Sequence, residues 1–209
     1  MKGTRIFIGA GLLGLSLSAM AQSRTMATFA DPATTATNMF TFTAPQSSAG
    51  PLGDTGSLIG SWSANGLTLQ TPGLNGGTYA NARLVVDNGS GGAISVNNGN
   101  TGTGQIRLYN GAVSPSNLLF TVSFQNARYN PVSFGAASLL GNGVVFSGPI
   151  VPAGLTNASF AFSFANQVVS GNSLNMTASF TSSAVPEPAS LAAFGLGAMA
   201  LIRRRRASK

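Results

Sequence analysis

The chain has 209 residues, of which 44% are hydrophobic and only 7% are charged, and its formal net charge is +7. This length suits one domain with a sizeable core. The sequence has no histidine and no cysteine, which excludes Ser-His-Asp and Cys-His catalysis, disulfides, and zinc sites built from these residues. Because the whole chain has only four carboxylate side chains, we expect no catalytic residues, no metal and no cofactor.

The positive charge lies at the two ends of the chain. Lys2 and Arg5 stand at the N-terminus, and residues 203–206 with Lys209 stand at the C-terminus. The body between them has four arginines and three aspartates, which leaves it a net charge of +1. Four scattered arginines cannot form a basic face for a phosphate backbone, so we exclude nucleic acid as a partner.

Residues 1–21 have the pattern of a secretory signal peptide. A short basic region precedes an uncharged apolar run over residues 6–17, and the small residues Ala19 and Ala21 follow. We expect a signal helix here, cut by signal peptidase before Gln22. The alternative is a retained membrane anchor, but the short run ends in the small residues that suit the peptidase.

The body, residues 22–180, is rich in Gly, Ser, Thr and Asn and contains short runs in which apolar and polar residues alternate. This alternation is typical of strands that bury one face, and no segment of the body has the spacing of an amphipathic helix. We therefore expect strands at residues 40–43, 67–70, 84–86, 94–96, 106–108, 120–124, 144–146, 160–164 and 174–180.

Asn-Gly dipeptides separate many of these runs, and four consecutive intervals between them are 10, 13, 10 and 12 residues. Asn and Gly tolerate the positive φ of tight hairpin turns. The spacing predicts an all-β fold, an antiparallel β-sandwich or jelly roll, with a β-solenoid as the alternative. The dipeptides are Asn65-Gly66, Asn75-Gly76, Asn88-Gly89, Asn98-Gly99, Asn110-Gly111 and Asn142-Gly143.

Two glycine-rich segments carry short likenesses to functional motifs. Asp54-Thr55-Gly56-Ser57 matches an aspartic protease signature, but no second copy exists to share its proton, so we interpret it as a turn. Asp87-Asn88-Gly89 could offer oxygens to Ca²⁺, but the EF-hand pattern is absent. We expect a type I′ turn there, between a strand ending at Val86 and one beginning at Ala93. A hydrolase would need two carboxylates within about 5–10 Å, drawn from these two aspartates and Asp31.

Four aromatic side chains are candidates for glycan contact. An aromatic face with Asn, Asp and Gln donors nearby is what stacking on a sugar ring requires. The alternative is packing in the core or at its edge, because Trp and Tyr bury large areas. The candidates are Trp62, Tyr79, Tyr109 and Tyr129.

The C-terminus has three parts in a fixed order. Residues 181–188 form a linker that ends in Val185, Pro186, Glu187 and Pro188, and fourteen uncharged residues, 189–202, follow. A fourteen-residue helix would be about 21 Å long, less than the roughly 30 Å of a hydrocarbon core. Its surface is nevertheless apolar all round, so we expect a membrane helix. The basic cluster after it would stop transfer and stay in the cytoplasm. This cluster is Arg203, Arg204, Arg205 and Arg206.

This tail resembles a PEP-CTERM sorting signal, a family pattern of a Pro-Glu-Pro box, a hydrophobic helix and terminal arginines. The pattern belongs to bacteria that have an outer membrane and make exopolysaccharide. The resemblance implies recognition by an exosortase, a membrane transpeptidase-like cysteine protease, and cleavage near the box. It covers about 25 of the 209 residues and implies no activity for the body. The alternative is permanent anchoring by the helix.

Taken together, these patterns predict a non-enzymatic exported protein with a structural or adhesive role. It would pass through the inner membrane and reach the cell surface or extracellular matrix. Its expected partners are signal peptidase, exosortase and, before processing, the membrane. The alternative function is a carbohydrate-binding module that retains exopolysaccharide.

Overall fold

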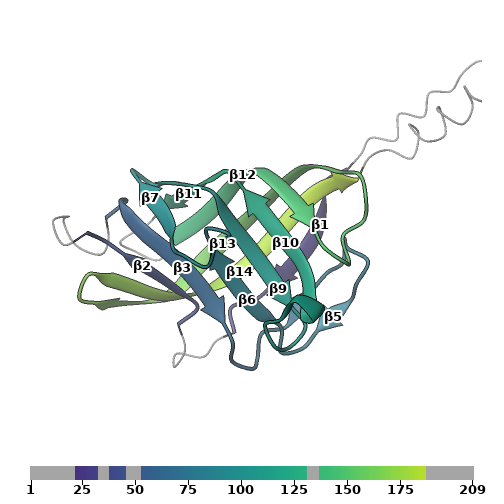
Figure 1. Cartoon of the computed structure of the whole chain (residues 1–209), viewed down its shortest axis with the longest axis horizontal. Helices are drawn as coiled ribbons and strands as arrows, with labels where there is room; N and C mark the ends of the chain where they lie inside the picture. The colour runs from purple at the N-terminus through teal and green to yellow at the C-terminus, as the bar shows by residue number, and fades with distance from the viewer. Residues whose placement is uncertain (1–21, 33–37, 46–52, 131–136, 187–209) are drawn as a thin grey trace, which may run out of the picture. The chain divides into compact units, whose positions relative to one another are not determined.

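A computed structural model describes residues 22–32, 38–45, 53–130 and 137–186, in which fourteen strands and one short 3-10 helix follow one another (Figure 1). The expected signal helix and the expected C-terminal helix with its arginine cluster lie outside these residues. Within the described ranges, no helix is both long enough and apolar enough to cross a membrane.

The strands vary greatly in length, from two residues to sixteen. The first seven are β1 Arg24–Phe29, β2 Phe40–Thr43, β3 Gly56–Trp62, β4 Leu69–Gln70, β5 Thr78–Tyr79, β6 Arg83–Asp87 and β7 Ile94–Asn97. The others are β8 Asn100–Thr101, β9 Gly104–Tyr109, β10 Leu118–Phe124, β11 Asn126–Asn130, β12 Ala137–Ser147, β13 Leu155–Ser170 and β14 Ser173–Pro186, with the 3-10 helix at Pro115–Asn117.

The strands form two facing layers of antiparallel sheet (Figure 1). One layer runs β10-β9-β6-β3, and the other runs β12-β13-β14-β1 and continues into the short strands β4 and β5. The layers are joined at both sides, because β2 pairs with both β3 and β14, and β10 pairs with β12. The predicted antiparallel β-sandwich is confirmed, and the solenoid alternative is wrong.

The core between the layers is filled by alternate residues of the long strands. Phe160, Phe162 and Phe164 of β13 all point inward and are at most 4% exposed. Phe162 packs against Phe40 of β2 and Phe180 of β14, with ring centroids 4.9 Å away in each case. Each buried phenylalanine contributes about 1.5–3 kcal/mol by burial, and close ring pairs add about 0.5–1.5 kcal/mol.

β3 is a strand that the sequence analysis did not predict, and its first residues replace part of the turn expected at Asp54–Ser57. Its inward positions are Leu58, Gly60 and Trp62. The glycine interrupts the apolar alternation, because the ring of Phe40 on the neighbouring strand covers the place of the missing side chain. A glycine at this core position breaks the alternation of apolar and polar residues by which a strand is recognised in a sequence.

The Asn-Gly dipeptides do not all make hairpin turns. Asn98 and Gly99 have φ of 48° and 71° and connect β7 directly to β8, which is the expected two-residue turn. Asn142-Gly143 instead lies inside β12, where the register with β13 shifts as in a β-bulge.

The type I′ hairpin expected at Asn88-Gly89 is also wrong. Strands β6 and β7 pair with successive parts of β3, at Gly60–Trp62 and at Gly56–Leu58. Because β2 pairs with the other edge of β3, β6 and β7 lie one after the other on a single edge, and the segment between them is a loop that returns to that edge. The Asn88 side chain accepts the N–H groups of Ser90 and Gly92 at 2.9 and 3.1 Å. The side chain acts beside a backbone hydrogen bond from the Asn88 N–H to the Gly92 carbonyl at 2.9 Å.

The expected linker at residues 181–188 needs a correction. Strand β14 continues to Pro186 and pairs with β13 throughout its length and with β1 over residues 180–184. Two prolines at the end of a segment do not prevent strand pairing when the first of them is the last residue of the strand.

We predict that Gly60→Ala destabilises the domain by about 1–3 kcal/mol, because its Cβ would lie 2.6 Å from Cε1 of Phe40. The matched control is Gly77→Ala, where nothing lies within 4 Å of the added Cβ, and we expect a change within about 0.5 kcal/mol. Urea unfolding of both variants measures the difference. Equal stability of the two variants would contradict the close contact of β2 and β3.

Candidate functional site

The two ends of the described domain lie side by side. Arg24, the first residue of β1, pairs with Ala184 near the end of β14. Gln22, which the predicted signal peptidase cut would make the first residue, is exposed two positions before β1. The predicted processing residues Ala19 and Ala21 lie outside the described residues. The fold therefore brings the predicted start of the mature chain next to the start of the C-terminal signal.

Side-chain hydrogen bonds join β1 to the last part of β14. The Ser182 hydroxyl donates to the Ala27 carbonyl and accepts from the Ala27 N–H, each at 3.1 Å, and Ser182 is 1% exposed. These bonds lie where the register of β1 shifts between Thr25 and Ala27. The Arg24 guanidinium also donates to the Gly73 carbonyl at 2.6 Å. At the bulge in β1, a side chain of β14 thus provides the hydrogen bonds of the Ala27 backbone N–H and carbonyl.

The pairing of β14 with β13 continues two residues beyond Ala184, where the pairing with β1 ends. Val185 pairs with Thr156 and Pro186 pairs with Leu155. The Thr156 hydroxyl donates to the Val185 carbonyl at 3.2 Å. Of the predicted processing residues, Val185 and Pro186 are therefore parts of a paired strand, whereas Glu187 and Pro188 lie outside the described residues.

The four aromatic candidates do not form an exposed platform. Trp62 and Tyr129 are 1% exposed and Tyr109 is 6% exposed, while Tyr79 is partly buried against the core. Trp62 is at an inward position of β3, and Tyr129 of β11 stacks on Phe42 with centroids 4.8 Å apart. The prediction that these residues offer a common face for glycan stacking is wrong, because the sandwich uses three of them as core.

The hydroxyl of Tyr129 and the indole N–H of Trp62 have no hydrogen-bond partner within the described part of the chain. Burial raises the pKa of Tyr129 above its ordinary value, because the phenolate would lose its hydration. The core therefore holds this phenol in its neutral form.

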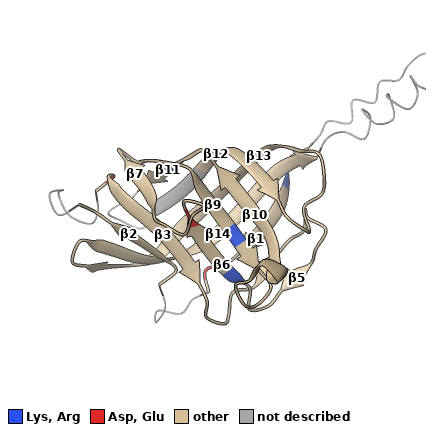
Figure 2. Ribbon diagram, in the orientation of Figure 1, with Lys and Arg blue, Asp and Glu red and all other residues tan. Residues whose placement is uncertain are grey.

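Over the described ranges, charged residues are few and are scattered over strands and loops (Figure 2). Asp87 on β6 is buried, and its carboxylate accepts hydrogen bonds from Arg107 on β9 and from the Gly89 N–H. The Asp31 carboxylate accepts from the hydroxyl of Thr177 on β14 at 2.8 Å. Two of the three aspartates considered for hydrolysis thus make contacts that join strands or loops.

Asp54 is exposed, and its side chain accepts a long hydrogen bond of 3.4 Å from the neighbouring Thr55 hydroxyl. Its backbone carbonyl accepts the N–H of Gly99 at 2.7 Å, which ties the loop before β3 to the β7–β8 turn. Over the described ranges, no group of three or more acidic residues gathers as a metal cage would require.

The match to a known protein family is confined to the C-terminal tail. A family model described as the PEP-CTERM protein-sorting motif matches residues 184–206. The resemblance predicted for the tail is confirmed, and the rest of the chain has no family assignment. No curated protein and no solved structure matches the chain.

The chain therefore carries a PEP-CTERM sorting signal, which implies a secreted protein that an exosortase processes. Its destination is the cell surface or the extracellular space. The matched segment begins at Ala184, inside strand β14.

We predict that Asp87→Ala destabilises the domain by about 2–4 kcal/mol, because Arg107 would keep a partly buried charge without its partner. Asp54→Ala is the control, since this exposed aspartate has no such partner among the described residues, and we expect a change within about 0.5 kcal/mol. Chemical unfolding of both variants checks this. Similar losses in both would show that the ion pair has no structural role.

We predict that Tyr129→Phe is at least as stable as the parent near neutral pH, because it removes a buried hydroxyl without a partner. Since the folded pKa is raised, the parent loses stability as the pH rises above about 10, where the unfolded tyrosine ionises. The advantage of the variant should grow by about 1.4 kcal/mol per pH unit. Urea unfolding near pH 7 and near pH 11 measures it. An advantage independent of pH would contradict the burial.

Proposed function

We propose that residues 22–186 are a non-catalytic structural or adhesive module of a bacterial surface or extracellular matrix. In this proposal, signal peptidase removes the N-terminal signal during export, and exosortase removes the tail after the hydrophobic helix has held the chain in the inner membrane. The observation that carries the proposal is the sorting motif, which is joined directly to the last strand of a closed sandwich.

The chemistry of the surface supports a structural role. The outward positions of the longest strands carry small hydroxyl side chains, such as Ser159, Ser163 and Thr181, and neither β13 nor β14 contains a charged residue. A neutral surface rich in hydroxyl groups can pack against similar surfaces without desolvating charges. Asp31 and Asp87, in contrast, are occupied in contacts that support the fold.

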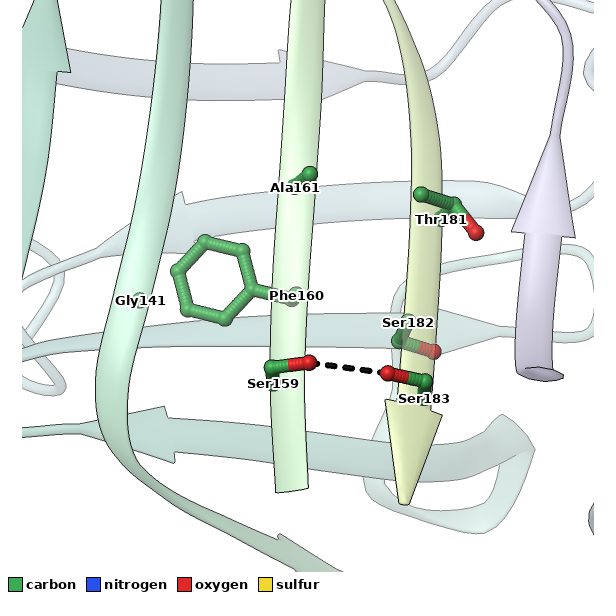
Figure 3. Close-up of a pocket in the computed structure, with 7 residues that line it drawn as sticks. All are labelled: Gly141, Ser159, Phe160, Ala161, Thr181, Ser182 and Ser183. Atoms are coloured by element: carbon green, nitrogen blue, oxygen red, sulfur yellow. Dashed lines mark hydrogen bonds between the residues drawn. The ribbon is translucent and has the colours of Figure 1, made fainter. Parts of the chain in front are cut away.

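Retention of exopolysaccharide is the alternative function. The aromatic side chains Trp62, Tyr109 and Tyr129 are buried and cannot stack on a sugar. A shallow groove of about 270 Å³ lies over β12, β13 and β14 instead (Figure 3). Its walls include the hydroxyl groups of Ser159, Thr181 and Ser183. Hydroxyl groups can bind sugars, but sugar-binding sites usually add aromatic stacking, so we prefer the structural role.

The proposal is tested by the mass of the protein recovered from membrane, surface and medium fractions. In cells with exosortase, the extracellular protein should begin at Gln22 and lack residues 203–206. In cells without exosortase, the tail should remain and the protein should stay in the membrane fraction. An intact tail in all extracellular material would contradict the proposal.

A paired set of variants separates the tail from the body. Replacing the four arginines 203–206 by alanine should reduce processing, because the helix would lose the charges that stop its transfer. Arg128→Ala, at an exposed position of β11, is the control and should be processed like the parent. Equal processing of all three proteins would contradict a role of the arginine cluster.

A further inference from the structure

The folded domain and the sorting signal overlap in sequence. The motif match starts at Ala184, whereas β14 ends at Pro186, so three residues of the matched segment belong to the sandwich. Ala184 is completely buried and pairs with Arg24. The signal therefore does not begin in a flexible linker, and its first residues take part in the packing of the domain.

Pairing on the two edges of β14 ends at different residues. Ser183 pairs with Thr25 of β1 on one edge and with Ser159 of β13 on the other. Beyond Ala184, Val185 and Pro186 pair only with β13 among the described residues. The strand thus goes from two occupied edges to one within the first three residues of the motif.

A protease that cuts a peptide in an extended conformation needs the edges of that peptide for its own backbone contacts. Residues up to Ala184 cannot offer them unless β14 leaves both neighbours, which would also uncover Phe180 and Ser182, now 2% and 1% exposed. Such an opening costs free energy, because it breaks the pairing of β14 with β1 and β13.

We infer that β14 sets the N-terminal limit of cleavage within the sorting signal: cleavage occurs on the folded protein, at the bond after Pro186 or a later one, and the mature protein keeps Val185 and Pro186. This inference rests on the proposed processing by exosortase. In the reaction, the carbonyl–nitrogen bond breaks and the released tail takes a proton on its new amine. The new C-terminus becomes a carboxylate if water is the acceptor, or an amide if an amine is.

The chain offers a direct way to lock this end of β14. The hydroxyl oxygens of Ser159 and Ser183 lie 2.8 Å apart on paired residues (Figure 3). Because the sequence contains no cysteine, Ser159→Cys with Ser183→Cys would create a single disulfide in the oxidising space outside the inner membrane. Ser163→Cys with Ser179→Cys locks a pair in the middle of the same hairpin and is the matched control.

The experiment uses the full chain in cells where exosortase can be induced. The precursor is first accumulated without exosortase, so that the domain folds and the disulfide forms, and exosortase is then induced. We expect the parent, the lock and the control to be cleaved equally, each leaving a product that ends at Pro186 or later by mass spectrometry. Reducing and non-reducing gels establish that the locked precursor was oxidised.

Two results would overturn the inference. One is a parent product that ends before Pro186. The other is an oxidised lock that resists cleavage while the control is cut, because this would mean that β14 must open first. If exosortase leaves the tail of the parent intact, the proposed processing itself fails, and the inference fails with it. The parent product alone remains decisive should both disulfide variants fold poorly.

Discussion

The packing of the β13 aromatic residues between the two layers is the interaction on which the rest of the structure depends. Phe160 contacts Phe124 of β10, and Phe162 contacts Phe40 of β2, so one strand touches both the opposite layer and the strand that joins the layers. With few charged residues and no disulfides in the chain, burial of apolar area must supply most of the stability.

The same packing places the first and last strands of the domain side by side. Strand β14 contributes Phe180 to the aromatic core and, a few residues later, passes into the sorting motif. Strand β1, which starts just after the predicted signal peptide, fills the other edge of β14. The predicted signal peptide and the sorting motif thus adjoin neighbouring strands of the body.

Much of this architecture could be predicted from sequence period and turn residues. The alternation in residues 160–164 indicated β13, and Asn98-Gly99 indicated a hairpin, because both signals are local. What escaped prediction depends on contacts between distant residues. The core glycine Gly60 is complemented by Phe40, and the end of β14 is a strand because β13 pairs with it to Pro186 and β1 pairs with it to Ala184. The exposure of Tyr129 could not be judged for the same reason, since Phe42 covers it.

Native-state hydrogen exchange of the exported protein tests the central claim most directly. If the β13 aromatics hold the layers together, the amides of Phe160–Phe164 should exchange only through global unfolding, with the free energy found by denaturant. Exchange of these amides through a local opening with a much lower free energy, while the amides of β9 and β10 stay protected, would contradict the account.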